Sequence, residues 1–406
     1  MIAELFATNP EFYVIHGCET GYYKQLFSGN IPFLTDMRII RSLLIGLFLL
    51  IAASISYRAI KRNAAGKKVF LSKYAGVRIF IEFFIAWELL LHLPYFSSEH
   101  HFVPDPISFW KANPAFAYYA QKKSIGIAGV DRDPIKGIFD TEYTSAKPAN
   151  TFRIIFMGDS QAISYRNIDY APNVCYPKFT QKLIRERGIT GPNGETVQII
   201  DAAISGYSSW QGLLFLKSDV LSLKPDLVVE AFGYHDHNSA YSYDKDVLTD
   251  SALICNMRRF AYMSNIFLMI RSMSLRSQAQ AVDTNEGERQ PQFVRVSPPQ
   301  FESNLKQFIS IGNNNGFKVV FYNEPVKYAR DSESMEAYYE VTDKLGKELN
   351  VPVIKTDDLF WSLPSDKRLK LFTDQVHFSP EGHSITAEFV LKRLQEEKIL
   401  SQGSRQ

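Results

Sequence analysis

The sequence predicts an α/β protein built on a doubly wound, five-stranded parallel sheet, preceded by an N-terminal membrane helix or helical hairpin. Three observations support this prediction. From residue 151 onward, short apolar runs rich in β-branched residues alternate with amphipathic stretches of helical length. Small and polar residues follow these runs, where a parallel sheet gathers its reactive groups. Before residue 98, two long apolar stretches are flanked by basic residues.

The expected strands and helices alternate along the folded part of the chain. The five strands are 152–157, 197–204, 226–232, 317–323 and 351–355. The five helices are 177–187, 209–223, 298–314, 334–349 and 380–397. The last helix has Ser379 as its N-cap and Pro380 at its first position, where a helix has no internal acceptor for an N–H. This alternation favours a parallel sheet with helices on both faces.

An insertion, residues 240–296, interrupts the alternation. A helix with Met, aromatic and Arg residues is expected at 258–273, and the polar stretch after it is expected to be disordered. A Met and aromatic stripe at this spacing usually packs against its own domain. A lid over a substrate is the alternative that the sequence leaves open.

Length and composition place most of the chain in one domain of about 250 residues. We divide the 406 residues into an N-terminal segment (1–36), a membrane anchor (37–98), a connector rich in Pro, Gly and aromatic residues (99–150) and the folded domain (151–400). A hydrophobic content of 46% and a charged content of 22% exclude a fibrous or natively unfolded chain. The three widely spaced cysteines form neither a disulfide framework nor a zinc pair, so no metal or cofactor is expected.

The net charge of +2 conceals an uneven distribution. Residues 37–78 contain nine basic residues and no acidic residue, whereas residues 1–36 are net acidic. The rest of the chain is mildly acidic and lacks the basic face that binding to a phosphate backbone requires. We therefore exclude nucleic acid as a partner and expect a membrane instead. The sequence identifies no protein partner.

The basic residues flank a membrane span expected at 39–57. Its uncharged part is slightly shorter than a bilayer core, and Arg41 can extend it by reaching to the headgroups. A buried core helix is the alternative, which the flanking bases disfavour. A second apolar stretch, 77–96, carries its ionisable residues on one helical stripe: Arg78, Glu82, Glu88 and His92. It either spans the membrane beside the first helix or lies in the interface as an amphipathic helix.

The loop between the two stretches predicts the orientation. Residues 58–78 hold seven basic residues and no acidic residue, and cytoplasmic loops are enriched in Lys and Arg. With two spans, everything after residue 97 lies outside the cytoplasm. Met37 begins a segment that resembles a signal-anchor start, so the sequence leaves open whether translation begins at Met1 or at Met37.

A candidate catalytic group of residues lies at the expected strand ends. Ser160 follows the first strand at a strand-to-helix turn, which exposes a hydroxyl beside free backbone N–H groups. His377, before the last helix, can act as its base, and Asp374 can accept the Nδ1 proton of that histidine. A developing oxyanion needs donors, and the candidates are the Ser160 N–H, the Gly206 N–H and a side chain after the third strand.

The order of four motifs resembles that of the SGNH (GDSL) hydrolase superfamily. They are F-x-G-D-S after the first strand, a Gly after the second, G-x-x-D after the third and D-x-x-H before the last helix. The resemblance covers about residues 104–397 and implies a flavodoxin-like fold and a serine esterase. It implies these roles: Ser160 as the block I nucleophile, Gly206 as the block II oxyanion glycine, Gly233 as the start of block III, and Asp374 and His377 as block V.

The connector also resembles that of membrane-anchored bacterial members, through Asp105-Pro106 and Lys147-Pro148. This resemblance implies an enzyme of the bacterial inner membrane with an extracytoplasmic catalytic domain. The expected substrates are O-acyl esters, above all acetyl esters, of a cell-envelope glycan or lipid. Four residues beside the motifs are expected to bind substrate: Asp159, Gly233, Tyr234 and Asp236.

One position departs from the family pattern, because block III is G-x-N-D and His235 occupies the slot of the oxyanion Asn. A neutral imidazole can donate one hydrogen bond, and an imidazolium adds positive charge, so a working hydrolase with an altered pH dependence is expected. Two alternatives stay open. The same Ser-His-Asp site could transfer the acyl group to an alcohol, or the domain could bind a glycan or an ester without cleaving it.

No metal site is expected among the histidines. His235 and His237 could share a metal, but no further ligand is suggested nearby, and a hydrogen-bonded loop is preferred. His100, His101 and His383 are expected to be surface or packing residues.

Overall fold

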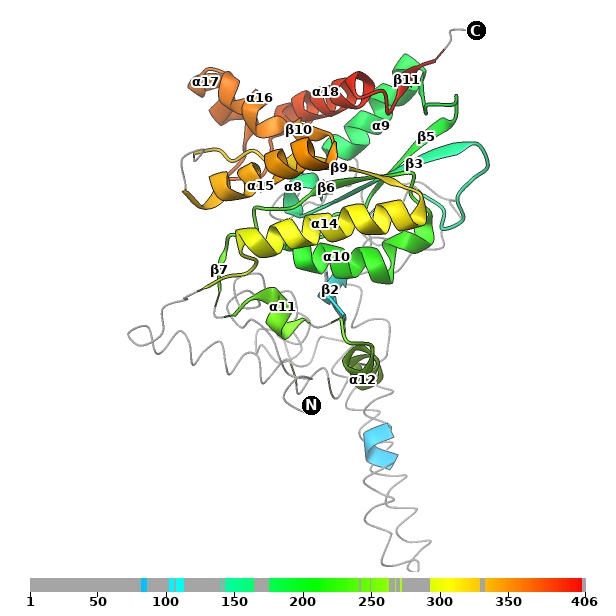
Figure 1. Cartoon of the computed structure of the whole chain (residues 1–406), viewed down its shortest axis with the longest axis vertical. Helices are drawn as coiled ribbons and strands as arrows, with labels where there is room; N and C mark the ends of the chain where they lie inside the picture. The colour runs from blue at the N-terminus through cyan, green and yellow to red at the C-terminus, as the bar shows by residue number, and fades with distance from the viewer. Residues whose placement is uncertain are drawn as a thin grey trace, which may run out of the picture.

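The structure is a computed structural model in which the fold is centred on one parallel sheet (Figure 1). It describes residues 82–85, 102–105, 107–112, 140, 143–163, 175–240, 242–248, 250–262, 267, 271, 293–328 and 333–403. All structural statements below concern these residues.

The sheet has five parallel strands in the order β10-β9-β6-β3-β5. Their bounds are β3 (Thr151–Gly158), β5 (Thr196–Asp201), β6 (Leu227–Ala231), β9 (Lys318–Asn323) and β10 (Val353–Lys355). The two central strands are buried along nearly their whole length, as expected where helices cover both faces. In the register, Ile155 of β3 lies between Ile200 of β5 and Val228 of β6. The predicted α/β fold with a five-stranded parallel sheet is confirmed.

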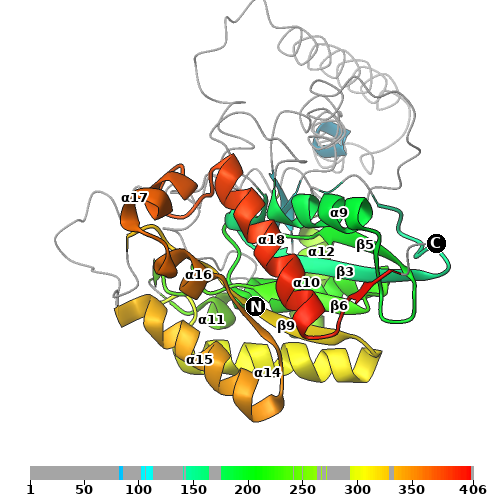
Figure 2. The same cartoon turned by 90° about the horizontal axis from the view of Figure 1, so that it is seen from above.

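Helices pack on both faces of the sheet. Five of them correspond to the helices expected from the sequence: α9 (Tyr176–Arg187), α10 (Ser209–Ser218), α14 (Pro298–Asn315), α15 (Glu333–Leu349) and α18 (Pro380–Glu396). One face is covered by α9 and α18 and the other by α10 and α14 (Figures 1 and 2). Ser379 caps α18 as expected, since its hydroxyl accepts a hydrogen bond from the Gly382 N–H, and Pro380 is the first helical residue.

The remaining elements complete the described fold. They are β1 (Phe102–Asp105), β2 (Phe109–Ala112), α8 (Ser160–Ile163), β4 (Ile189–Thr190), η2 (Val220–Leu223), β7 (Ser239–Ala240), α11 (Asp244–Val247), α12 (Ala252–Tyr262), β8 (Phe293–Val294), α16 (Thr356–Ser362), α17 (Ser365–Arg368), η3 (Leu369–Leu371) and β11 (Ser401–Gln402).

Three expected elements differ in their bounds. The strand expected at 197–204 ends at Asp201, where the carboxylate accepts the Ala203 N–H and turns the chain. The helix expected at 209–223 is divided into α10 and the 3₁₀ turn η2. The helix expected at 258–273 begins earlier, since α12 spans Ala252–Tyr262, and most of the remaining insertion lies outside the described residues.

The connector (99–150) is not merely laid over the surface, as the sequence suggested. Strands β1 and β2 form an antiparallel hairpin that inserts Trp110 into the core, where this side chain is 1% exposed. The ring of Trp110 meets Tyr207 edge to face, with centroids 5.6 Å apart. Strands of four residues each are too short for a periodic signal, so only the packing identifies them.

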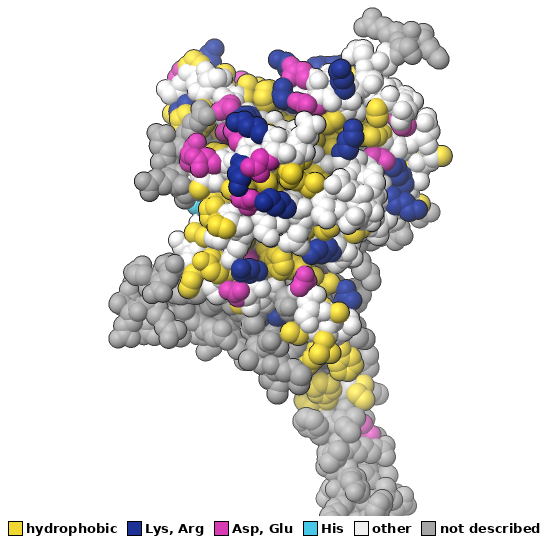
Figure 3. All heavy atoms as spheres, viewed as in Figure 1, with side chains coloured by type: hydrophobic (Ala, Val, Ile, Leu, Met, Phe, Trp, Pro, Cys, Tyr) yellow, Lys and Arg dark blue, Asp and Glu magenta, His cyan; other side chains and the backbone are white. Residues whose placement is uncertain are grey.

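The predicted membrane anchor lies largely outside the described residues. Of the stretch 77–96, the structure describes one helical turn at 82–85, whose Phe83, Phe84 and Ile85 side chains are exposed. Leu253 and Phe260 of α12 are also exposed, and hydrophobic side chains gather at this end of the molecule (Figure 3). Within the described part of the chain, no helix combines the length and the apolar character needed to cross a bilayer.

Candidate active site

The candidate site lies at the carboxyl edge of the sheet, where the loops after four strands meet. Ser160 begins α8 directly after β3. A Cβ at Gly158 would lie 2.6 Å from the Ala231 carbonyl oxygen, so glycine permits the close approach of β3 and β6 just before the serine. The sequence therefore places the Ser160 hydroxyl on a turn that emerges from the centre of the sheet.

The structure brings Ser160, His377 and Asp374 into one hydrogen-bonded chain. His377 Nε2 lies 2.8 Å from Ser160 Oγ, and His377 Nδ1 lies 2.6 Å from Asp374 Oδ2. The other carboxylate oxygen of Asp374 accepts the backbone N–H groups of Val376 (2.9 Å) and His377 (2.8 Å). The carboxylate thus orients both the loop and the imidazole.

The electrostatics of this loop keep Asp374 ionised. Partial burial by itself would raise its pKa, but hydrogen bonds from the backbone N–H groups of His377 and Val376 lower the pKa below its ordinary value. An ionised carboxylate at this position holds the proton of the imidazole on Nδ1 and leaves Nε2 facing the serine hydroxyl.

Gln161 joins the two halves of this arrangement, and the sequence analysis did not identify it. Its Nε2 donates to the carbonyl oxygens of Pro325 and Val376, each at 2.9 Å. The residue after the serine is thereby bound to the loop that carries His377. Its position next to Ser160 is the only sequence signal that could have pointed to it.

Asp159 is expected to bind substrate, but its carboxyl is buried and faces the protein. Oδ1 accepts the Gln161 N–H at 2.8 Å, and Oδ2 lies 3.5 Å from His235 Nε2. Burial raises the pKa of Asp159 to about 6, against the opposing effects of the Gln161 N–H and of His377. Its position fits a support for the serine turn and for His235, and not direct contact with substrate.

Glu324 lies beside Asp159, and the sequence analysis missed it. It directly follows β9 and is buried. Burial and then the charge of Asp159 raise the pKa of Glu324 well above its ordinary value, so the fold favours the protonated form of this carboxyl. A polar residue immediately after a strand was the signal that could have found it.

His235 occupies the loop after β6 and is buried, with both ring nitrogens facing polar groups. Its Nδ1 lies 2.9 Å from Asn238 Nδ2, an amide that the sequence analysis did not single out. When that amide donates to Nδ1, the proton of a neutral ring is on Nε2, the nitrogen that faces Asp159.

Gly233 and Tyr234 begin the same loop. Gly233 has a φ of 139°, which a side chain would disfavour, so its contribution is a backbone conformation. Tyr234 is half-buried between His235 and His237, at centroid distances of 5.2 and 5.1 Å. Burial and then the charges of Asp159 and Asp374 raise the pKa of Tyr234 to about 12, so a neutral phenol borders the site.

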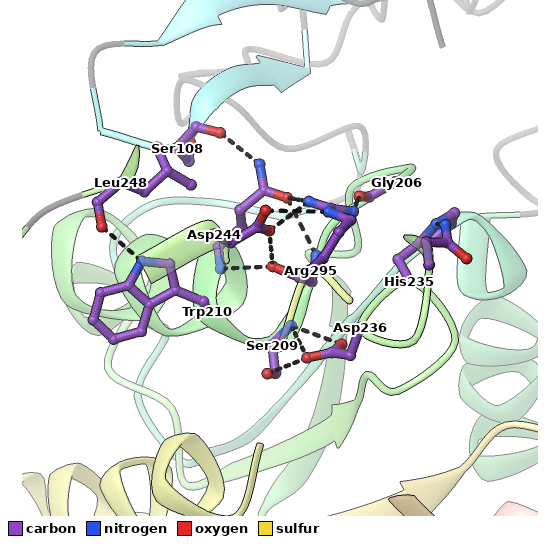
Figure 4. A network of polar contacts seen from close by, with 12 residues as sticks. Ser108, Gly206, Ser209, Trp210, His235, Asp236, Asp244, Leu248 and Arg295 are labelled. Atoms are coloured by element: carbon purple, nitrogen blue, oxygen red, sulfur yellow. Dashed lines mark hydrogen bonds and ion pairs between the residues drawn. The ribbon is translucent and has the colours of Figure 1, made fainter. Parts of the chain in front are cut away.

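Asp236 is also expected to bind substrate, and this expectation does not fit its position. Its carboxyl is fully buried and accepts the Ser209 N–H at 3.0 and 3.1 Å and the Ser209 hydroxyl at 2.5 Å (Figure 4). Burial raises its pKa to about 7, although the hydrogen bonds from Ser209 oppose this shift. Asp236 ties the loop after β6 to the start of α10.

Gly206 lies in the loop between β5 and α10 with a φ of 80°, in the left-handed region that favours glycine. Its carbonyl oxygen accepts a hydrogen bond from Arg295 at 2.8 Å (Figure 4).

His383, expected at the surface or in packing, is buried and stacks on Tyr176. Among the residues described, no three His, Cys, Asp or Glu side chains group as metal ligands.

The chain matches one protein-family model and several solved structures. The model of the GDSL-like Lipase/Acylhydrolase family matches residues 156–385, more than half of the chain. No curated protein matches. A lipase/acylhydrolase from Enterococcus faecalis is 19% identical, with 62% of this chain and 99% of that chain covered and a TM-score of 0.41. The acetyl xylan esterase AlAXEase is 16% identical, with 59% and 98% covered and a TM-score of 0.40. The chain belongs to the GDSL-like lipase/acylhydrolase family and is an ester hydrolase of that family.

Proposed function

We propose that this chain is a serine esterase that hydrolyses O-acyl esters through a covalent acyl-enzyme, with Ser160, His377 and Asp374 as its catalytic residues. The observation that carries the proposal is the continuous chain of hydrogen bonds from Ser160 Oγ through the His377 ring to the Asp374 carboxylate. A serine hydroxyl is unreactive alone, and this arrangement supplies both a base and the group that orients the base.

In the first step, Ser160 Oγ attacks the ester carbonyl carbon while His377 Nε2 takes the hydroxyl proton. The Asp374 carboxylate accepts a hydrogen bond from the His377 Nδ1–H and stabilises the imidazolium. The tetrahedral intermediate collapses when His377 returns the proton to the departing alcohol oxygen. Water then attacks the acyl-serine by the same route in reverse, with His377 again as base and then as acid, which frees the carboxylic acid and Ser160.

The oxyanion of each intermediate needs hydrogen-bond donors, and we propose the Ser160 N–H, the Gly206 N–H and the His235 Nε2–H. The pairing of Asn238 with Nδ1 favours a proton on Nε2 of His235. Asp159 Oδ2 lies 3.5 Å from the same nitrogen, and we propose that this buried carboxylate orients the imidazole. The imidazole can therefore stand in for the family's Asn.

The substrate class that we propose is an acetyl or other small acyl ester of a cell-envelope glycan or lipid. We further propose that the enzyme is anchored in a bacterial inner membrane with its catalytic domain outside the cytoplasm. Two observations support the anchoring: the apolar stretches 39–57 and 77–96 are separated by a basic loop, and Phe83, Phe84 and Ile85 expose apolar side chains.

The activity is tested with the purified full-length chain, p-nitrophenyl acetate and a fluorophosphonate probe. We expect turnover of the ester and labelling of the peptide that contains Ser160. Both should be lost in Ser160→Ala and retained in Ser362→Ala, which removes an exposed hydroxyl from α16. Equal turnover in Ser160→Ala, or no labelling of Ser160, would contradict the esterase proposal.

Topology is tested with single cysteines and a membrane-impermeant maleimide in intact cells. Ser365→Cys in the catalytic domain should react before lysis, and Ser72→Cys in the basic loop only after lysis. The reverse pattern would overturn the orientation.

The substrate class is tested by mass spectrometry of envelope polysaccharide and lipid from cells with the enzyme and from cells with Ser160→Ala. The substrate should carry extra acetyl groups in cells with the variant.

A further inference from the structure

The loop that carries Gly206 is held by residues from outside the sheet. We call residues 205–208, just before α10, the Gly206 loop. The indole Nε1–H of Trp110, in the hairpin β1–β2, donates to the Ser205 carbonyl oxygen at 3.1 Å. The guanidinium Nη1 of Arg295, just after β8, donates to the Gly206 carbonyl oxygen at 2.8 Å. Two successive carbonyls of the loop are therefore fixed from two different parts of the chain.

The bond from Trp110 has a direct consequence for the Gly206 N–H. The Ser205 carbonyl and the Gly206 N–H belong to the same planar peptide group, and in a trans peptide they point in opposite directions. No cis peptide occurs among the described residues. When the indole fixes the carbonyl, it also fixes the direction of the N–H that we propose as an oxyanion donor. A glycine with a φ of 80° would otherwise allow this peptide to rotate more freely than other residues.

Arg295 connects the Gly206 loop with the loop that carries His235. Its side chain binds the Gly206 carbonyl, while its own N–H donates to the Asn238 carbonyl at 2.9 Å. The next N–H, of Val296, donates to the Asp236 carbonyl at 3.0 Å. One residue is thus bonded to both loops that would supply oxyanion donors after β5 and β6.

The guanidinium of Arg295 is itself immobilised, since it is 2% exposed and paired with a buried carboxylate. Its Nη2 donates to Asp244 Oδ2 at 2.7 Å and to Gln211 Oε1 at 2.5 Å (Figure 4). Asp244 Oδ2 also accepts the Ser208 hydroxyl at 2.7 Å. A charged group held this way defines one position for its neighbours, because every alternative leaves a buried charge without its partner.

The β1–β2 hairpin makes further hydrogen bonds near the Gly206 loop. Gln211 Nε2 donates to the Ser108 carbonyl at 2.8 Å (Figure 4), and the Tyr207 hydroxyl lies 2.7 Å from Ser108 Oγ. The hairpin therefore contacts the chain on both sides of Gly206, through Ser108 as well as through Trp110.

We propose that Trp110 and Arg295 are positioning residues that orient the Gly206 N–H and set its distance from His235, so that the oxyanion hole is preorganised before substrate binds. This inference rests on the proposed esterase activity. Preorganised donors stabilise charge that develops only in the transition state, so their disturbance lowers kcat more than it changes KM.

The test compares conservative variants of the full-length chain with matched controls on p-nitrophenyl acetate. Trp110→Phe keeps an aromatic ring in the core and removes the indole N–H together with part of the ring volume. Its control, Trp210→Phe, removes an indole N–H that donates to the Leu248 carbonyl at 2.8 Å, away from the Gly206 carbonyls. Arg295→Lys keeps the charge beside Asp244, and its control, Arg258→Lys, alters a buried arginine that donates to the Val247 carbonyl.

We expect kcat to fall by about 10- to 100-fold in Trp110→Phe and in Arg295→Lys, less than or equal to the loss of a whole oxyanion donor, with KM within about two-fold of wild type. The controls should lose a similar amount of thermal stability and retain kcat. Unchanged kcat in Trp110→Phe, or an equal fall in both controls, would overturn the inference. Should Arg295→Lys not fold, the Trp110→Phe result decides alone. A wild type without Ser160-dependent turnover would instead overturn the proposed function and this inference together.

Discussion

Two histidine–aspartate pairs lie at the carboxyl edge of the sheet, and their surroundings give them different properties. In the first pair, His377 Nδ1 and Asp374 Oδ2 are 2.6 Å apart, and 52% of the Asp374 side chain is exposed. In the second pair, His235 Nε2 and Asp159 Oδ2 are 3.5 Å apart, and both side chains are buried. The His377–Asp374 pair is therefore partly exposed to solvent, whereas the His235–Asp159 pair is buried.

The difference shows that hydrogen bonds and burial decide what each pair can do. Backbone N–H groups stabilise the charge of Asp374 and lower its pKa, so the pair with His377 is suited to a base. Burial raises the pKa of Asp159 to about 6 and raises the pKa of Glu324 well above its ordinary value. The second pair is therefore suited to hold and orient His235 and not to accept the proton of Ser160.

Removing the base of the first pair should have the largest effect. In His377→Gln, no group can take the Ser160 proton, and we expect kcat for p-nitrophenyl acetate to fall by about 10⁴-fold or more. The matched control is His237→Gln, which changes a histidine in the loop after β6. A fall of less than about 100-fold in His377→Gln would show that another group is the base.

Neutralising the aspartate of the first pair should cost nearly as much. Asp374→Asn keeps the shape of the side chain but favours the wrong tautomer of His377, so we expect a fall in kcat of about 10⁴-fold. Asp159→Asn should cost far less, because Asp159 does not orient the base. The comparison fails if the two variants lose activity equally.

His235 should have an intermediate effect that depends on the replacement. His235→Ala removes a proposed oxyanion donor, and we expect kcat to fall by about 10²-fold or more. His235→Asn restores the family's amide donor and should preserve or raise activity while its pH profile becomes flatter. A complete loss of activity in His235→Asn would contradict the donor role.

Glu324 should have the smallest effect on activity and a measurable effect on stability. Because its folded-state pKa is raised, the folded protein binds a proton that the unfolded chain releases, so this contribution is complete below the ordinary carboxyl pKa. It is lost as the pH rises toward the raised value. Glu324→Gln keeps a neutral side chain of similar size and removes the titration. Urea unfolding at about pH 5 and about pH 8 should show a smaller loss of stability in the variant than in wild type. An equal loss in both would refute the assigned protonation.

Several features of the site followed from local sequence. The strand-to-helix turn at Ser160, the N-cap at Ser379 and the D-x-x-H spacing of Asp374 and His377 depend on residues close in the chain, so they could be predicted. Asp159 and Asp236 were expected to face substrate because they follow strands, but a strand end alone does not tell which side chains turn inward. Glu324 and Gln161 were missed because their contacts join loops far apart in sequence.

The sequence by itself determined the alternation of strands and helices, the family, and the order in which the motif residues follow their strands. It could do so because apolar periodicity and turn chemistry act over a few residues. Only the tertiary structure decided that Trp110 of the connector and Arg295 at the end of the insertion meet at the Gly206 loop. Contacts across about 90 residues depend on how the whole chain packs, and no local pattern encodes them.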